Sequence, residues 1–213
     1  FLVALDMAAN ALALGRYRCV LIVSSEVASG GLDASTPATA GLFGDGAAAV
    51  VVGRSAADDG SALLSSRLSS YGDGAELCRI RGGGTRYPRG EEQSPEALRS
   101  FSMDGRGAYR FAARHLPAFW ERLLGEAGTT TAALRCLVPH QASGGGLDHV
   151  VQALGLRPDQ VIRILQATGN QVAASLPHAL HHARIERRMQ RGDLVALLGT
   201  GAGLAIGGMV LRY

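Results

Sequence analysis

The stretch GDLVALLGTGAGLAIGGMVLRY, residues 192–213, decides how this chain is expected to fold. Residues 194–199 are an apolar run typical of a buried strand, and residues 204–213 predict a further strand after the turn GTGAG. Directly before them, residues 175–190 predict a helix with Ser175 as a possible cap. The end of the chain therefore predicts the order helix, strand, glycine-rich turn, strand.

The beginning of the chain repeats this order. Residues 1–14 are rich in Ala and Leu and apolar on nearly every side, which predicts a buried helix. Residues 18–24 predict a buried strand, and the turn FGDG at 43–46 leads into a second apolar run at 47–53. This weak internal duplication predicts two similar α/β halves packed together.

The middle of the chain joins the two predicted halves. It contains a short strand near 61–68, a polar region with a long loop at 81–90, and a helix over 105–126. Residues 136–142 predict a strand that ends in a loop, and a helix follows over roughly 145–154. We expect residues 1–70 to belong to an N-terminal half, residues 71–104 to connect, and residues 105–213 to form a C-terminal half.

Composition excludes several classes of protein. With 47% hydrophobic and 18% charged residues, the 213-residue chain can build a core. The net charge of +3 comes with scattered arginines and few aromatics among them, which argues against a nucleic-acid partner. No apolar run long enough to span a membrane is present, and three distant cysteines suggest no disulfide framework or zinc site, so a cytoplasmic location is expected. Because the chain begins inside a helical pattern without an initiator Met, we expect a piece of a longer polypeptide.

Two polar residues are candidates for chemistry. His140 follows an apolar strand, and strand C-terminal ends are where sites form in α/β sheets, although a satisfied loop histidine fits as well. Asn170 lies at a junction of loop and helix, where a turn-forming role is the commoner one. The turns at 44–46 and 199–203 are either tight connections or sources of backbone N–H groups for an oxyanion hole.

Three further sets of residues have weaker signals. His178, His181 and His182 share one helix at metal-ligand spacing, but a solvated helix face is the default interpretation. Cys19 and Cys136 lie in apolar strands and are expected to be core thiols. The last set consists of arginines near the long loop, which are either solvated or contacts for phosphates: Arg81, Arg86, Arg89 and Arg106.

Six ordered motifs together resemble the initiating ketosynthase family, β-ketoacyl-acyl-carrier-protein synthase III, of the thiolase superfamily. They are FLVALDMA, LFGDGAAAVV, MDGRGAYRFA, LVPHQAS, GNQVAAS and the closing strand–turn–strand. In the family, the helix that FLVALDMA resembles directly follows the nucleophilic cysteine in a Cys-x-Gly-Phe context. The cysteine is therefore expected immediately upstream of Phe1, and residues 1–70 are the remainder of the N-terminal thiolase-like half.

The resemblance implies a five-layered αβαβα fold and a homodimer or related heterodimer. It implies an acyltransferase that performs a decarboxylative Claisen condensation in fatty-acid or polyketide biosynthesis, with acyl carrier protein or coenzyme A thioesters as substrates and no metal or redox cofactor. His140 and Asn170 would stabilise the enolate, and the backbone N–H of Ala202 would belong to the oxyanion hole. Substrate-binding residues would be Arg106, Tyr109 and Ser143.

The chain departs from the family pattern at three positions that concern substrate recognition. Ser143 replaces the usual Asn, Gly145 stands where some relatives have a basic residue, and Pro37 stands where relatives often have Arg. Three alternatives therefore remain beside decarboxylative condensation. They are head-to-head condensation of two acyl-coenzyme A molecules without decarboxylation, acyl transfer to a hydroxyl or amine, and a non-catalytic partner subunit.

Overall fold

The computed structural model describes residues 1–32, 35–56, 58–85, 87–88, 98 and 100–213. Its α-helices are α1 (Leu2–Ala13), α2 (Pro37–Ala40), α3 (Gly105–Glu126), α4 (Gly144–Ala153), α5 (Leu165–Thr168) and α6 (Ser175–Ile185). Its strands are β1 (Cys19–Glu26), β2 (Gly46–Gly53), β3 (Ala62–Ser70), β4 (Cys78–Ile80), β5 (Phe101–Met103), β6 (Cys136–Pro139), β7 (Leu194–Gly201) and β8 (Ala205–Arg212).

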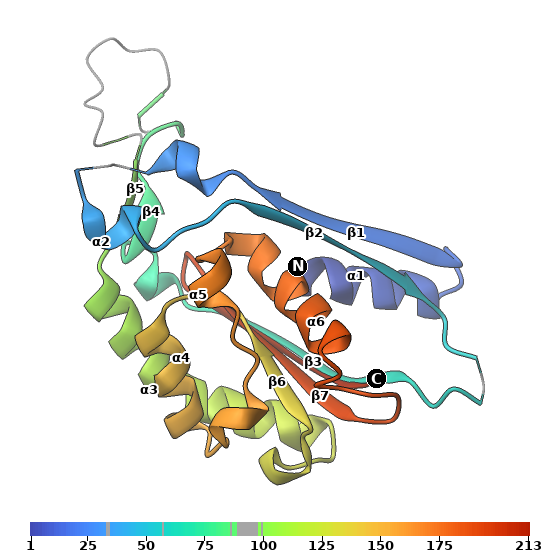
Figure 1. Ribbon diagram of the computed structural model, residues 1–213. Coiled ribbons are helices and arrows are strands. Elements are labelled where there is room, and N and C mark those ends of the chain that lie inside the picture. The colour runs from blue at the N-terminus through green and yellow to red at the C-terminus, as the bar shows by residue number, and fades with distance from the viewer. Residues whose placement is uncertain (33–34, 57, 86, 89–97, 99) are drawn as a thin grey trace.

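The two larger sheets form alternating layers with the helices. Strands β1 and β2 pair antiparallel, and a four-stranded sheet has the order β3-β8-β7-β6. Within that sheet β6 runs parallel to β7, and the other pairs are antiparallel. Helices α1 and α6 lie between the two sheets, and α3 covers the opposite face of the four-stranded sheet (Figure 1). The described residues thus show four successive layers: sheet, helices, sheet, helices.

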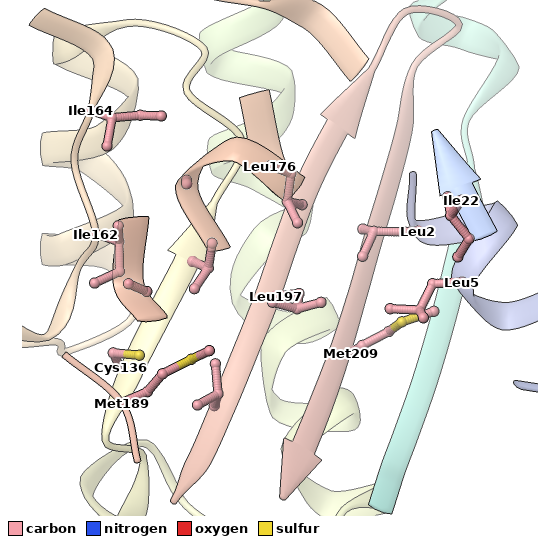
Figure 2. Close-up of a cluster of buried hydrophobic side chains, with 14 of the residues drawn as sticks. Leu2, Leu5, Ile22, Cys136, Ile162, Ile164, Leu176, Met189, Leu197 and Met209 are labelled. Carbon is pink, nitrogen blue, oxygen red and sulfur yellow. The ribbon is translucent and has the colours of Figure 1, made fainter. Parts of the chain in front are cut away.

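The core follows this layering. One cluster of buried side chains, which includes Leu5, Leu176 and Met209, fills the space between the sheets around α1 and α6 (Figure 2). A second cluster, which includes Phe119 and Trp120 of α3, lies on the other face of the four-stranded sheet. Successive residues of β7 alternate between the two clusters, since side chains of a strand point to opposite faces. The continuous apolar run at 194–199 is therefore buried on both faces.

The predicted duplication is confirmed in the order and pairing of the elements. Helix α1 is followed by the antiparallel pair β1–β2, and helix α6 is followed by the antiparallel pair β7–β8. The predicted division of the chain stays a prediction. Strand β3, which belongs to the first predicted half, pairs with β8 in the sheet of the second.

Two apolar surfaces differ from the prediction of full burial. Helix α1 buries one face through Leu5 and its neighbours, whereas Val3 and Met7 remain 57% and 67% exposed. The outward face of the β1–β2 pair exposes the partners Leu21 and Val51. An apolar sequence shows that a surface is suited to burial, but the packing decides which face is covered. Cys19, predicted to be a core thiol, is exposed on the same pair of strands, so that prediction was wrong.

Cys136 is buried as predicted, and burial raises the pKa of its thiol to about 11. Two element predictions need correction. Helix α6 ends at Ile185, and Arg187 has a φ of 55°, so the chain leaves the helix before the predicted end at 190. The predicted connecting region contains the short antiparallel pair β4–β5. Part of the predicted loop at 81–90 lies outside the described residues.

Candidate active site

A cavity of about 720 Å³ contains the two polar residues singled out in the sequence. His140 and Asn170 both line it, and its wall is largely apolar. Side chains from both ends of the chain contribute, including Phe1, Phe43, Phe101, Leu147, Leu204 and Ile206. An apolar enclosure with few polar groups is the usual form of a small-molecule site, because hydrogen bonds within it are not weakened by competing water.

His140 directly follows strand β6, whose C-terminal end opens into the cavity. Its backbone N–H donates to the carbonyl of Leu198 at 2.7 Å, so β7 fixes its position. Its Nδ1 lies 2.5 Å from Oγ of Ser175. Burial lowers the pKa of His140 from 6.5 to about 4. The imidazole is therefore neutral at physiological pH and carries one ring proton.

Gln141 holds the segment after His140 in place. Its side chain is fully buried and donates from Nε2 to the carbonyls of Pro139 and Ile162 at 2.9 and 3.1 Å. Its Oε1 accepts from the backbone N–H groups of Ile164 and Leu165. All hydrogen-bonding positions of one buried amide are thus used to join β6 to the neighbouring segment, which makes His140 a residue on a rigid support.

Asn170 is 7% exposed, and its amide has a defined orientation. Its Oδ1 accepts the backbone N–H of Val172 at 2.9 Å, and its Nδ2 donates to the carbonyl of Ala142 at 3.2 Å. Because the NH₂ group carries two hydrogens, one remains after the bond to Ala142. Val172 itself has a φ of 50°, a strained value for a β-branched residue.

The turn at 43–46 packs closely against the loop that contains Asn170. The N–H of Gly44 donates to the carbonyl of Asn170 at 3.1 Å. A Cβ on Gly44 would lie 2.0 Å from the carbonyl oxygen of Thr168, and one on Gly46 would lie 2.1 Å from Nε2 of Gln171. The two glycines are required for this close approach. The N–H of Gly44 is therefore bound within the protein. Residues 199–202 line the cavity and residues 44–46 are not among its described lining residues, so the turn at 199–203 is the better candidate for an oxyanion hole.

The other predicted site residues lie in different settings. Ala202 lines the cavity beyond the end of β7. Ser143 lines it as well and caps α4 by accepting the N–H of Gly146 at 3.1 Å. Tyr109 of α3 also lines it, and its hydroxyl lies 3.0 Å from Nδ1 of His149. Arg106 is exposed on α3 and is not among the described residues that line the cavity.

Sequence reasoning missed Ser175 as a neighbour of His140. It assigned Ser175 to a helix cap, but α6 begins at Ser175 and its side chain makes no cap hydrogen bond. That prediction was wrong because the hydroxyl is used by His140 instead. His149, which packs against Tyr109, was also missed. Neither residue has a signal in the sequence, because each meets its partner only through the fold.

The weaker candidate sets lie elsewhere. His178 donates from Nδ1 to Oε1 of Gln171 at 2.7 Å, because an amide oxygen only accepts. Among the described residues, no group of three or more His, Cys, Asp or Glu is arranged to hold a metal ion. Arg86 and Arg89 lie outside the described residues. In the part of the chain that the structure describes, no helix is long and apolar enough to cross a membrane.

Helices between two sheets, with His140 and Asn170 in one apolar cavity, agree with the thiolase-like fold that the sequence resemblance implies. Two family profiles agree with this. The profile described as 3-oxoacyl-[acyl-carrier-protein (ACP)] synthase III matches residues 1–72, and the profile of its C-terminal part matches residues 124–213. The chain belongs to the 3-oxoacyl-[acyl-carrier-protein] synthase III family.

Individual relatives agree with the family. The chain is 35% identical to β-ketoacyl-[acyl-carrier-protein] synthase III of Symbiobacterium thermophilum over 97% of its own length and 62% of the relative's. It is similar to the crystal structure of the Aquifex aeolicus 3-oxoacyl-[acyl-carrier-protein] synthase III, with a TM-score of 0.88, 32% identity, and coverage of 100% of this chain and 64% of that one. The priming β-ketosynthase of the R1128 polyketide pathway matches with a TM-score of 0.88 and 30% identity, over 99% of this chain and 62% of that one. The chain thus spans less than two thirds of the length of these relatives.

Proposed function

We propose that the protein is a ketosynthase III-type acyltransferase, which condenses an acyl thioester with a malonyl thioester and releases carbon dioxide. The observation that carries this proposal is the pair of polar residues in the apolar cavity. Both line it; His140 is held at Nδ1, and Asn170 is held at Oδ1 and through one hydrogen of its NH₂ group. The other ring nitrogen of His140 and the second NH₂ hydrogen of Asn170 are then free to bind one substrate oxygen. The names of the relatives support fatty-acid or polyketide biosynthesis as the setting.

The chemistry requires two such donors. When the malonyl carboxylate leaves as carbon dioxide, the electrons of the broken carbon–carbon bond pass to the thioester and form an enolate. The negative charge collects on the thioester oxygen, where N–H donors from His140 Nε2 and Asn170 Nδ2 stabilise it. The apolar wall strengthens both hydrogen bonds. The enolate carbon then attacks the acyl group, and the new carbon–carbon bond forms as the acyl thioester breaks.

The acyl group would be held by a cysteine upstream of Phe1, in the Cys-x-Gly-Phe context that the resemblance implies. Phe1 lines the cavity and stands at the N-terminal end of α1, where the helix dipole favours a thiolate. Attack of this thiolate on an acyl thioester gives an acyl-enzyme and frees the thiol carrier. The backbone N–H of Ala202, together with that of the cysteine, would bind the oxyanion of this step.

Substrate and partner contacts complete the proposal. Tyr109, Ser143 and Arg106 would meet the carrier arm of an acyl carrier protein or coenzyme A thioester. A dimer, formed with a second copy or a related chain, would cover apolar surfaces such as those around Met7 and Leu21. No metal or redox cofactor enters the steps above, and a cytoplasmic location fits the free thiols.

The proposal is tested by carbon dioxide release from malonyl thioester in the full-length enzyme. We expect His140→Ala to lower the rate roughly 100-fold or more, the range seen when one oxyanion donor is removed. His178→Ala is the matched control, because His178 is partly buried on α6 but does not line the cavity. Normal condensation by the His140→Ala protein would refute the assigned role.

The alternatives give different results in the same enzyme. Intact-mass measurement after incubation with acyl thioesters detects the acyl-enzyme. An adduct without carbon dioxide release indicates head-to-head condensation or transfer to a hydroxyl or amine, and the product separates these two. Absence of any adduct indicates a non-catalytic partner subunit.

A further inference from the structure

The hydroxyl of Ser175 lies among three polar atoms in a fully buried position at the start of α6. Its Oγ is 2.5 Å from Nδ1 of His140, 3.0 Å from the carbonyl oxygen of Val172 and 3.3 Å from the backbone nitrogen of Gln141. An unpaired polar group in a buried position costs free energy. The available protons must therefore be placed so that each of these groups takes part in a hydrogen bond.

The possible arrangements are few. The N–H of Gln141 only donates, so Oγ accepts from it, and the carbonyl of Val172 only accepts. The hydroxyl has one proton, which goes either to the carbonyl of Val172 or to Nδ1 of His140. In the first case Nδ1 must carry the ring proton and donate to Oγ. In the second case Nδ1 is bare and accepts.

Two observations favour the second arrangement. The distance of 3.0 Å between Oγ and the carbonyl oxygen of Val172 lies at the long end of the range for a bond that a hydroxyl donates to an oxygen. The carbonyl of Val172 also has another donor, because it accepts the backbone N–H of Ser175. The hydroxyl proton can therefore go to His140 without leaving that carbonyl unpaired.

We propose that Ser175 is a positioning residue that donates its hydroxyl proton to Nδ1 of His140 and so fixes the tautomer with the ring proton on Nε2. Because burial keeps the imidazole neutral, the ring has only this one proton. The inference deepens the proposed function and rests on it for its consequence. Only the Nε2–H tautomer donates a hydrogen bond to the substrate oxygen; the other tautomer would present a lone pair to the enolate.

The loop that contains Val172 orients the side chains of both proposed donors, Asn170 and His140. The N–H of Val172 binds the side-chain oxygen of Asn170, and the carbonyl of Val172 accepts the backbone N–H of Ser175, whose hydroxyl binds His140. The strained backbone of Val172 is thus the common anchor of two side chains that come from different segments. Strain of this kind persists at functional sites where surrounding contacts hold it.

The test is nitrogen NMR of histidine-labelled full-length protein, in which protonated and bare ring nitrogens have different shifts. The signal of His140 is assigned by its loss in His140→Gln. We expect a protonated Nε2 and a bare Nδ1 in the wild type, and a mixture of tautomers in Ser175→Ala. Ser65→Ala is the matched control, because Ser65 is also buried and donates to the carbonyl of Leu123 at 3.0 Å. The His140 signal of the Ser65→Ala protein should match that of the wild type.

Kinetics provide the second measurement. We expect Ser175→Ala to lower kcat for carbon dioxide release roughly tenfold, because loss of one hydrogen bond changes a rate by up to about that factor. KM should be nearly unchanged. A proton on Nδ1 in the wild type, or an unchanged tautomer in Ser175→Ala, overturns the inference. The wild-type spectrum decides the place of the proton even if the variant fails to fold. Since the spectrum needs no substrate, an enzyme with the expected tautomer but no carbon dioxide release would refute the proposed function alone.

Discussion

The backbone N–H of Val172 donates to Oδ1 of Asn170 over 2.9 Å and so decides which end of the Asn170 amide faces a ligand. With its oxygen held, Asn170 has its NH₂ group left to donate to Ala142 and to the cavity. We therefore expect Asn170→Asp to keep the bond from Val172 but to lose the donor. Carbon dioxide release should fall roughly 100-fold, since a carboxylate would also repel the enolate. The measurement is steady-state release from malonyl thioester.

Gln152→Glu serves as the control for this prediction. It makes the same change from amide to acid at an exposed position of α4. Its rate should equal that of the wild type. If Asn170→Asp also kept the wild-type rate, Asn170 would have no role as a donor.

Backbone strain at Val172 predicts an unusual response to glycine. Its φ of 50° costs a β-branched residue about 1–2 kcal/mol, which glycine avoids. We expect Val172→Gly to leave the free energy of unfolding unchanged or to raise it by up to about 1 kcal/mol, as measured by urea denaturation. Val23→Gly, at an exposed position in β1, should instead destabilise by about 1 kcal/mol. Equal losses in the two variants would contradict the assignment of strain to Val172.

Burial of His140 predicts a pH dependence of stability. The pKa is about 4 in the folded protein and 6.5 without burial, so between these values the unfolded chain binds more protons. The contribution of His140 to stability is fully present above pH 6.5 and is lost as the pH falls through 4. The loss is roughly 3 kcal/mol at most. Urea unfolding of wild type and His140→Gln between these pH values should show a smaller acid-induced loss of stability in the variant; parallel curves would count against a neutral His140 in the folded protein.

Contact between the turn at 43–46 and the Asn170 loop predicts a severe effect of a single methyl group. Gly44→Ala would place Cβ 2.0 Å from the carbonyl oxygen of Thr168, which is backbone and cannot rotate away. We expect a loss of about 3 kcal/mol or more in the free energy of unfolding, together with loss of carbon dioxide release. The control Gly125→Ala, an exposed site in α3 with open space around it, should stabilise by about 0.5–1 kcal/mol. A fully stable Gly44→Ala protein would show that the loop can shift.

Much of the secondary structure could be predicted because it depends on local patterns. The apolar runs that became β1, β2, β7 and β8 are explicit in the sequence, and so is their repeated order after a helix. Burial was less predictable. The runs that contain Cys19 and Met7 are apolar, yet both residues are exposed, because the position of a strand or helix in the layers decides which face is covered.

The sequence by itself determined the order of the main helices and strands, the family, and the candidacy of His140 and Asn170, since these depend on residue types and their spacing. The tertiary structure alone decided how the two side chains are held. Ser175 is 35 residues from His140, and the carbonyl of Ala142 is 28 residues from Asn170. A hydrogen bond depends on distance and direction between atoms that only the packed fold brings together, so no local pattern could reveal these partners.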